Sequence, residues 1–219
     1  MFHETFAAWL TLLALGMFHG VNPGMGWLFA VALGMQEKSH RAVVRALWPL
    51  GMGHALAVGV AVLIAMLVGA VVPLGYLRWL VAGILAVLGA SRLYRHRHPR
   101  WASMQVGPWK LTLWSFLMAS AHGAGLMVVP VFLGLATVHA ESGCHPGDAA
   151  VVHAPGTALL ATSLHAAGYL IVTALLALVV FHKLGLSLLR RAWFNLDLIW
   201  AAALIATGGL TVLVPFGLK

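Results

Sequence analysis

The chain is poor in charge, and acidic residues are the scarcest charged type. Charged residues make up 8% of its 219 positions and only five are Asp or Glu, whereas soluble domains carry roughly 25% charged residues. The sequence offers no paired carboxylates, no phosphate-binding loop and no nucleophile with a matching base. We therefore expect that the protein is not an enzyme.

Cysteine is almost absent. Cys144 is the only one, so an intrachain disulfide cannot form and no CxxC or zinc-finger spacing exists. The formal net charge of +8 would suit a nucleic-acid partner, but the basic residues stand at the ends of apolar runs. We expect no nucleic-acid partner, and we attribute the charge to membrane topology.

Apolar sequence is what the chain has in abundance. Hydrophobic residues make up 62% of it, too much apolar surface for one soluble domain of this size to cover. About 20 consecutive apolar residues cross a bilayer, and sufficiently long runs occupy 6–34, 43–71, 74–95, 109–138, 157–182 and 196–216. These runs predict an all-α integral membrane protein of six transmembrane helices, forming a single membrane domain in the lipid bilayer.

The basic residues predict the orientation of these helices. The segments after the first, third and fifth spans hold all of the 13 Lys and Arg residues except Arg78 and Lys219. Segments rich in Lys and Arg face the cytoplasm in most membrane proteins. We therefore expect the N-terminus and the C-terminus on the outer, periplasmic side, in an inner membrane of bacterial type.

The chain repeats itself at low similarity. The sequence LGMFHGVNPGMGW of the first span is echoed by MASAHGAGLMVVP in the fourth, and GMGHALAVGVAVLIA in the second by TSLHAAGYLIVTALL in the fifth. This predicts two three-helix repeats, 1–108 and 109–219. Because three is an odd number of crossings, the second repeat is inverted relative to the first, which is a common transporter architecture with its site at the midplane.

Four histidines lie well inside predicted spans. The repeat pairs His19 with His122 and His54 with His165. Ionisable groups at membrane depth usually face the bundle interior or a water-filled path, and neutral imidazole is the commonest metal ligand. We predict that all four histidines bind a transition metal, although hydrogen bonding between helices is the simpler role for any one of them.

The segment Gly20–Gly26 combines a proline with three glycines inside the first span. Irregular backbone at membrane depth occurs where it is buried in protein or lines a cavity. We therefore predict a first helix broken near Gly20–Gly26, with Asn22 beside His19 as a substrate-binding residue. Methionines near these histidines along the sequence, such as Met25, would suit a soft ion like Cu(I), although methionine more often fills gaps in a core.

The loop after the fourth span gathers further metal-binding side chains. They are His139, Cys144, His145, Asp148 and His153. We interpret this loop as a capture site for a metal at the outer mouth of the protein, with an ordinary polar loop as the alternative. Its spacing matches no known metal cage.

Two short motifs resemble the LysE-type transporter superfamily, in particular its nickel/cobalt permease branch (NicO-, RcnA- and HupE-like). They are His19-Gly20-Val21-Asn22-Pro23 and Gly53-His54-Ala55-Leu56. The resemblance implies a fold of about six spans with a broken first helix, and transport of Ni or Co. The family usually has an aspartate and a second histidine after the first one, whereas this chain has Asn22 and Gly26-Trp27.

These features favour a small membrane transporter that moves a transition-metal ion (Ni, Co or Cu) or a small metal complex through a midplane histidine site. One alternative is a membrane subunit that holds a cofactor, because histidine pairs across helices also bind b-type haem and such a site could hold copper. Another is an accessory subunit of a larger membrane complex, or a homo-oligomer. The sequence alone leaves these alternatives open.

Overall fold

The computed structural model describes residues 2–94, 107–141, 155–184 and 196–213. Within these ranges the chain forms helices and turns, and no strand. The α-helices are α1 (Phe2–Val21), α2 (Trp27–Gln36), α3 (His40–Gly69), α4 (Leu74–Tyr94), α5 (Pro108–Ala121), α6 (Ala124–Glu141), α7 (Pro155–Val179) and α8 (Leu196–Leu213). Two short elements complete them, the 3-10 turn η1 (Pro23–Met25) and the π-helical η2 (Val180–Leu184). The predicted all-α class is confirmed.

Some of these helices are long and apolar enough to cross a membrane. Among the described residues they are α3 and the continuous helix Pro155–Lys183, with α5 and α6 as a third if that bent pair forms one span. They fall on the predicted runs 43–71, 157–182 and 109–138. The other apolar helices are shorter, so the predicted total of six crossings stays a prediction.

The first helix is interrupted between Val21 and Trp27. The side-chain oxygen of Asn22 accepts a hydrogen bond of 2.9 Å from the amide of Gly24, and Pro23 begins the 3-10 turn. Gly26 then takes a φ of +129°, in a region that residues with a Cβ rarely adopt. This local chemistry ends α1 and starts α2 in a new direction, inside the predicted break.

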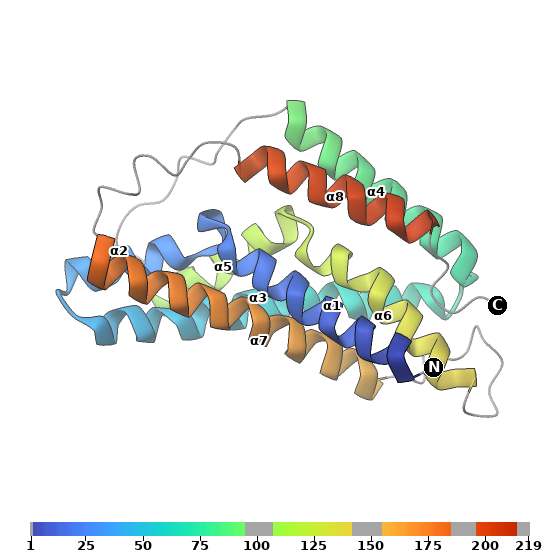
Figure 1. Ribbon diagram of the computed structural model, residues 1–219, viewed down its shortest axis with the longest axis horizontal. Coiled ribbons are helices and arrows are strands. Elements are labelled where there is room, and N and C mark those ends of the chain that lie inside the picture. Colours follow the sequence, from blue (N-terminus) through green and yellow to red (C-terminus); the bar gives the residue numbers. More distant parts are fainter. Residues whose placement is uncertain (1, 95–106, 142–154, 185–195, 214–219) are drawn as a thin grey trace.

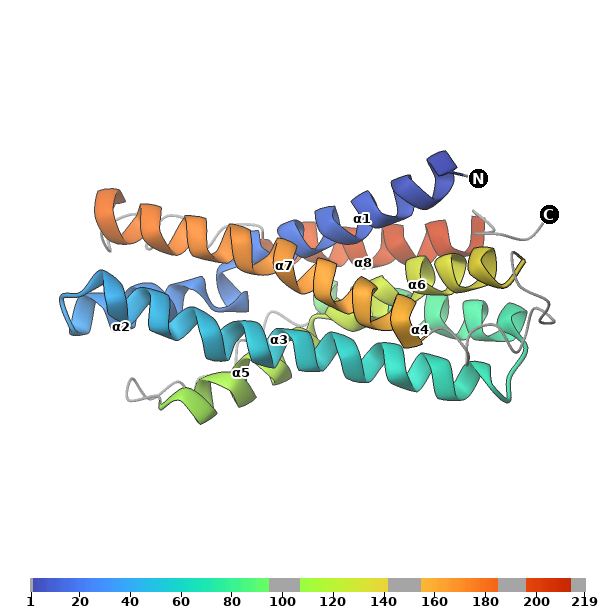
Figure 2. The ribbon, with the colours of Figure 1, turned by 90° about the horizontal axis from the view of Figure 1, so that it is seen from below.

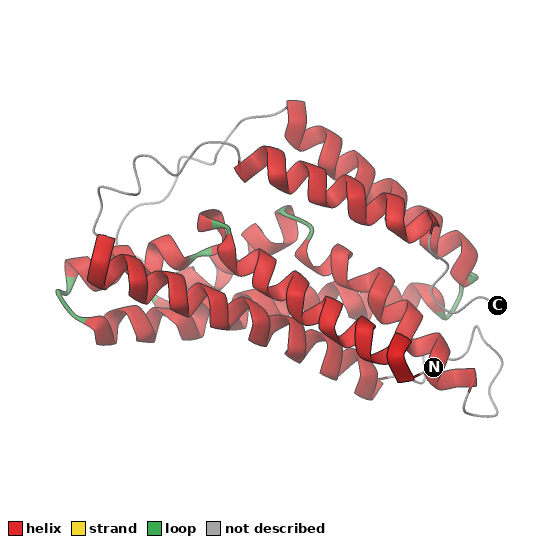
Figure 3. Ribbon diagram, viewed as in Figure 1, coloured by secondary structure: helices red, strands yellow, loops and turns green. Residues whose placement is uncertain are grey.

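A second interruption separates α5 from α6. His122 follows the last residue of α5, Gly123 takes a φ of +73°, and the two helices meet at a bend of 64°. A glycine in this conformation is a common way to end a helix. Both interruptions are short loop segments between helices (Figure 3).

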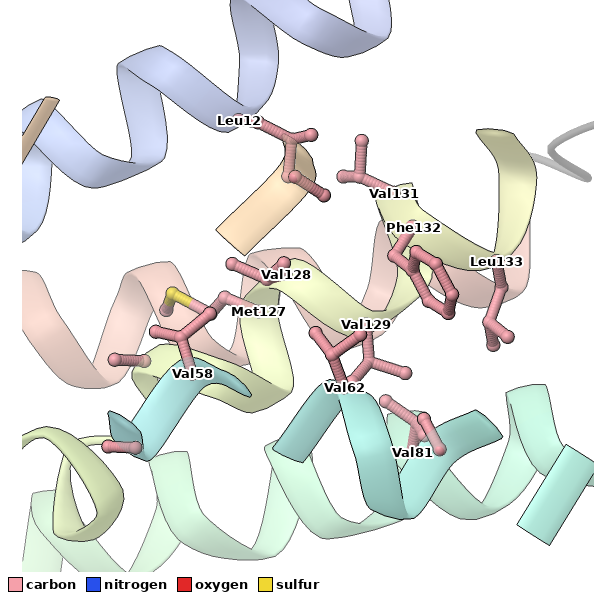
Figure 4. Close-up of a cluster of buried hydrophobic side chains, with 14 of the residues drawn as sticks. Leu12, Val58, Val62, Val81, Met127, Val128, Val129, Val131, Phe132 and Leu133 are labelled. Carbon is pink, nitrogen blue, oxygen red and sulfur yellow. The ribbon is translucent and has the colours of Figure 1, made fainter. Parts of the chain in front are cut away.

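Helix α6 lies at the centre of the protein. It contacts α1, α3, α4, α5, α7 and α8, and its residues from Ala124 to Ala136 are buried except for Leu126, which is half-buried. A helix that is apolar on every side is expected to be surrounded by protein or lipid. Figure 4 shows how α6 packs: Val128, Val129 and Phe132 lie among side chains from α1, α3 and α4, including Leu12, Val62 and Val81.

Six of the remaining helices pack in three close pairs, and α2 packs against α3 and α7. Helix α1 runs along α7, α3 runs along α5, and α4 runs along α8 (Figures 1 and 2). The α4–α8 pair forms one side of the molecule (Figure 1), and a hydrogen bond of 2.7 Å from the Arg78 guanidinium to the Val212 carbonyl joins the two helices. The site described below lies where α1, α3, α7 and α8 approach one another.

The helix ends separate into two groups. The start of α1 and the end of α8 lie at one end of the molecule, whereas the turn between α2 and α3, the start of α5 and the end of α7 lie at the other (Figures 1 and 2). The second group of helix ends carries Lys38, Arg41, Arg45, Lys110 and Lys183. Arg45 forms an exposed ion pair of 2.7 Å with Glu37 there. Basic residues of the described chain are thus concentrated at the end opposite the start of α1.

Candidate metal centre

Three of the four predicted histidines converge in the interior. His19 comes from α1, His54 from α3 and His165 from α7, and the exposed fraction of each is 0%. The ring centroids are 5.0 Å apart for His19 and His165, 5.4 Å for His54 and His165, and 5.7 Å for His19 and His54. The helices therefore bring three imidazoles into one triangle.

Backbone carbonyls fix two of the three rings. The Nδ1 atom of His19 is 2.7 Å from the carbonyl oxygen of Leu15, and Nδ1 of His165 is 3.2 Å from that of Leu12. A carbonyl only accepts, so Nδ1 carries the hydrogen and donates it, and Nε2 of the neutral ring keeps its lone pair. Both Nε2 atoms are buried without a hydrogen-bond partner in the described part of the chain. Histidines that bind metals are held in the same manner.

The third ring is held by ring contacts alone. Neither nitrogen of His54 has a hydrogen-bond partner among the described residues. Its ring stacks on Tyr169 with a centroid distance of 3.9 Å and planes 6° apart, and on His165 with planes 10° apart. A buried polar group without a partner is unfavourable by about 1–3 kcal/mol, so the two His54 nitrogens are the least satisfied polar atoms of the triangle.

The spacing of the three rings matches that of an ion with three imidazole ligands. With metal–nitrogen bonds of ~2.0 Å, the centres of three such rings around a trigonal ion lie about 5.4 Å apart. The rings of His54 and His165 are stacked, however, with planes 10° apart. In the described chain no group of three His, Cys, Asp or Glu side chains is already arranged as a metal site.

His122 is buried at the second helix break, next to the triangle. Its Nδ1 atom is 2.8 Å from the carbonyl oxygen of Met118, four residues earlier, as Nδ1 of His19 is with Leu15. The Trp200 indole contacts both histidines, with centroid distances of 4.7 Å to His19 and 5.7 Å to His122. It also donates a hydrogen bond of 3.0 Å to the His122 carbonyl. His122 thus adjoins the triangle through Trp200.

The other predicted site residues have different positions. Asn22 is buried directly after the turn that holds His19, and its side-chain oxygen caps η1. Its role in binding a substrate stays a prediction. The outer-loop candidates lie outside the residues whose side chains the structure describes; they are His139, Cys144, His145, Asp148 and His153.

Two aromatic residues of the site were missed by the sequence analysis. Tyr169 could have been found, because it follows His165 by four positions and therefore lies on the same face of α7. Trp200 could not, because nothing in the sequence indicates which of the nine Trp residues would face a histidine. Both are buried and both contact a histidine ring.

One pair of equivalent positions in the two halves makes different contacts across the helix pairs. Aligning His19 with His122 aligns Leu12 of α1 with Ser115 of α5. The Leu12 carbonyl lies at hydrogen-bond distance from His165, whereas the Ser115 hydroxyl donates a bond of 2.7 Å to the Leu50 carbonyl of α3. His165 therefore has an anchor across the helix pair that His54 lacks.

No family model, no curated protein and no solved structure matches this chain. A function therefore has to be inferred from the chemistry of the site. Three neutral imidazoles in an apolar interior can bind a cation or carry a proton. The unpartnered nitrogens of His19, His54 and His165 are the atoms that could coordinate such a cation.

Tyr169, whose ring stacks on His54, is itself held in place by a hydrogen bond from its hydroxyl. It donates a buried hydrogen bond of 2.6 Å to the carbonyl of Met25. Tyr169→Phe keeps the ring that stacks on His54 but leaves this carbonyl without its donor, so we expect a loss of about 1–3 kcal/mol in unfolding free energy. Thermal unfolding of the purified variant in detergent measures this loss. Tyr76→Phe, on an exposed side chain of α4, is the matched control and should leave stability unchanged.

Proposed function

We propose that this chain is a small membrane transporter that binds a transition-metal ion, or a small metal complex, at His19, His54 and His165. The observation that carries the proposal is the triangle of fully buried imidazoles with unpartnered nitrogens. Polar groups of this kind are rare in an apolar interior without a partner. At membrane depth they usually mark a pathway for an ion or a substrate.

The ring packing favours an ion over haem. Two histidines that bind haem face each other across a flat macrocycle. Here the rings of His54 and His165 stack on each other, and His19 has its ring centroid 5.0 Å from that of His165. A macrocycle would have to separate these rings and the helices that carry them, whereas a single ion would require only rotation of a side chain.

Transport, as opposed to static binding, is supported by the exchange of partners between the two halves. Helix α1, which ends at the first break, packs along α7, and α5, which ends at the second break, packs along α3. If α1 corresponds to α5 and α3 to α7, the first helix of each half, which ends at a break, packs against a helix of the other half in an equivalent arrangement: α1 against α7, and α5 against α3. Two inverted repeats, 1–108 and 109–219, would produce this pattern. Rocking of one repeat against the other would then open the histidines to each side in turn.

The orientation follows from the charges. The end of the molecule where Lys38, Arg41, Arg45, Lys110 and Lys183 lie would face the cytoplasm. The start of α1 and the end of α8 would then lie on the periplasmic side of a bacterial inner membrane. A cysteine introduced at exposed Lys38, in the turn between α2 and α3, in a background in which Cys144 is replaced by serine, would react with a membrane-impermeant maleimide only after the membrane is permeabilised; reaction from outside would contradict this orientation.

The proposal is tested by metal uptake into proteoliposomes. Purified protein would be reconstituted and the accumulation of Ni²⁺, Co²⁺, Zn²⁺ and Cu⁺ followed with an ion-sensitive dye inside the vesicles. We expect uptake of at least one ion above that of empty vesicles, with saturation at high concentration. If none of the four ions is accumulated and none is bound by the detergent-purified protein, the transporter proposal is wrong.

A further inference from the structure

We propose that the site is selective for a monovalent ion of the d¹⁰ type, Cu⁺, held by Nε2 of His19 and of His165, with His54 as a third ligand that turns in and out. This inference rests on the proposed function and names its substrate class. It depends on the charge, the number and the mobility of the ligands.

The charge of the ligands favours a monovalent ion. All three ligands are neutral imidazoles at 0% exposure, in a chain with only five acidic residues. Among the described carboxylates, Glu37 is engaged in an exposed ion pair with Arg45 at a helix turn. A cation in a low-dielectric site with no carboxylate among the described side chains is poorly compensated, and this penalty rises steeply with the charge of the ion. A divalent ion therefore suits the triangle less well than Cu⁺.

The number of ligands leads to the same choice. Ni²⁺ and Co²⁺ usually take four to six ligands, and Zn²⁺ is almost always four-coordinate, whereas Cu⁺ is satisfied by two or three. Imidazole is a suitable ligand for copper. The triangle supplies two fixed nitrogens and a third after rotation of one ring, and the other aromatic rings that contact it in the described chain are Phe18, Trp200 and Tyr169.

The third ligand is the mobile one. His19 and His165 are anchored through Nδ1, whereas His54 makes only ring contacts, with His165, Tyr169 and His19. Rotation of His54 about its side-chain bonds breaks no hydrogen bond in the described structure. An ion can therefore pass between a three-coordinate and a two-coordinate state. Such a change in coordination would let the site release its ion while His19 and His165 keep their hydrogen bonds to the Leu15 and Leu12 carbonyls.

The test is a competition for ions with the purified full-length chain in detergent. Under anaerobic, reducing conditions the protein would compete for Cu⁺ with a chromophoric Cu⁺ chelator, and parallel equilibrium dialysis would measure Ni²⁺, Co²⁺ and Zn²⁺. We expect one Cu⁺ per chain, bound at least ~100-fold more tightly than Ni²⁺ or Co²⁺. Ag⁺, a redox-stable ion with the same coordination preference, should compete with Cu⁺.

Alanine variants distinguish the two anchored ligands, His19 and His165, from the mobile ligand His54. We expect His19→Ala and His165→Ala to weaken Cu⁺ binding by about 100-fold or more, and His54→Ala by only about 10-fold. His182→Ala, on an exposed ring in η2, should bind as the wild type does. Far-ultraviolet circular dichroism and gel filtration would verify that each variant is folded, and His→Gln replacements serve where an alanine variant is not.

The outcomes also separate this inference from the proposed function. Tighter binding of Ni²⁺, Co²⁺ or Zn²⁺ than of Cu⁺, lost in the His19 and His165 variants, would overturn the selectivity and leave the metal site in place. Equal losses in all three variants would overturn the distinct role of His54. Absence of binding for every ion would overturn both proposals.

Discussion

Replacing either anchored histidine by alanine is expected to reduce metal uptake into proteoliposomes to the level of empty vesicles. His19→Ala and His165→Ala each remove one Nε2 from the triangle and leave two imidazoles at most for the ion. Loss of a partner that only orients a ligand already weakens metal binding by 10–100-fold. Loss of the ligand itself should therefore weaken binding by about 100-fold or more.

His40→Ala and His182→Ala are the matched controls for this result. Both remove an exposed histidine at the end of the molecule opposite the start of α1, so they change the histidine content without touching the triangle. They should keep the uptake rate of the wild-type protein. Uptake that persists in the His19 and His165 variants, or that is lost in the two controls, would mean that the triangle is not on the transport path.

The second large effect is expected from adding one methyl group to α1. A Cβ on Gly16 would overlap the carbonyl oxygen of His165 and lie 3.1 Å from the amide nitrogen of Tyr169. Both are backbone atoms of α7, so they cannot move without shifting the helix. Gly16→Ala should therefore push α1 from α7 and destabilise the protein by about 1–3 kcal/mol or more, as overpacking does elsewhere.

The same shift should also weaken metal binding, because α1 and α7 carry the two anchored ligands. Gly83→Ala is the matched control: this glycine is exposed in the middle of α4, and a Cβ there meets no atom within 4 Å. Because Gly is roughly 0.5–1 kcal/mol less favourable than Ala inside a helix, the control should be neutral or slightly more stable. Thermal unfolding in detergent and ion binding measure both variants. Equal melting temperatures for the two variants would contradict the close α1–α7 contact.

The histidine triangle could be predicted in part from sequence because the information is local and repeated. His19 and His54 stand in short motifs that have counterparts around His122 and His165. Their depth within apolar runs implies that they are buried, and the structure buries all four. The break after His19 could be predicted as well, since Pro23 and Gly26 determine the backbone conformation there.

What the sequence could not supply is the partner of each group across helices. The predicted set of four treated His122 as equivalent to the others, but Trp200 of α8 lies against it and against His19. The bond from Ser115 to the Leu50 carbonyl, which makes the two halves unequal, depends on how α3 and α5 pack. Such contacts join residues far apart in the chain, and no periodicity or motif encodes them.

The central position of α6 was also not predicted. The run 109–138 was expected to be one span like the others, but the turn at His122–Gly123 directs α6 into the middle of the bundle. Its uniformly apolar sequence fits a lipid-exposed helix and a buried one equally well. Only the packing against Leu12, Val62 and Val81 distinguishes the two (Figure 4).

X-ray absorption at the copper edge of the Cu⁺-loaded wild-type protein tests most directly whether imidazoles from three helices share one ion. We predict two or three nitrogen neighbours at ~2.0 Å, with the outer-shell scattering of imidazole rings, and loss of one such ring in His165→Ala. A spectrum dominated by sulfur, or one that is the same in His165→Ala as in the wild type, would contradict the site.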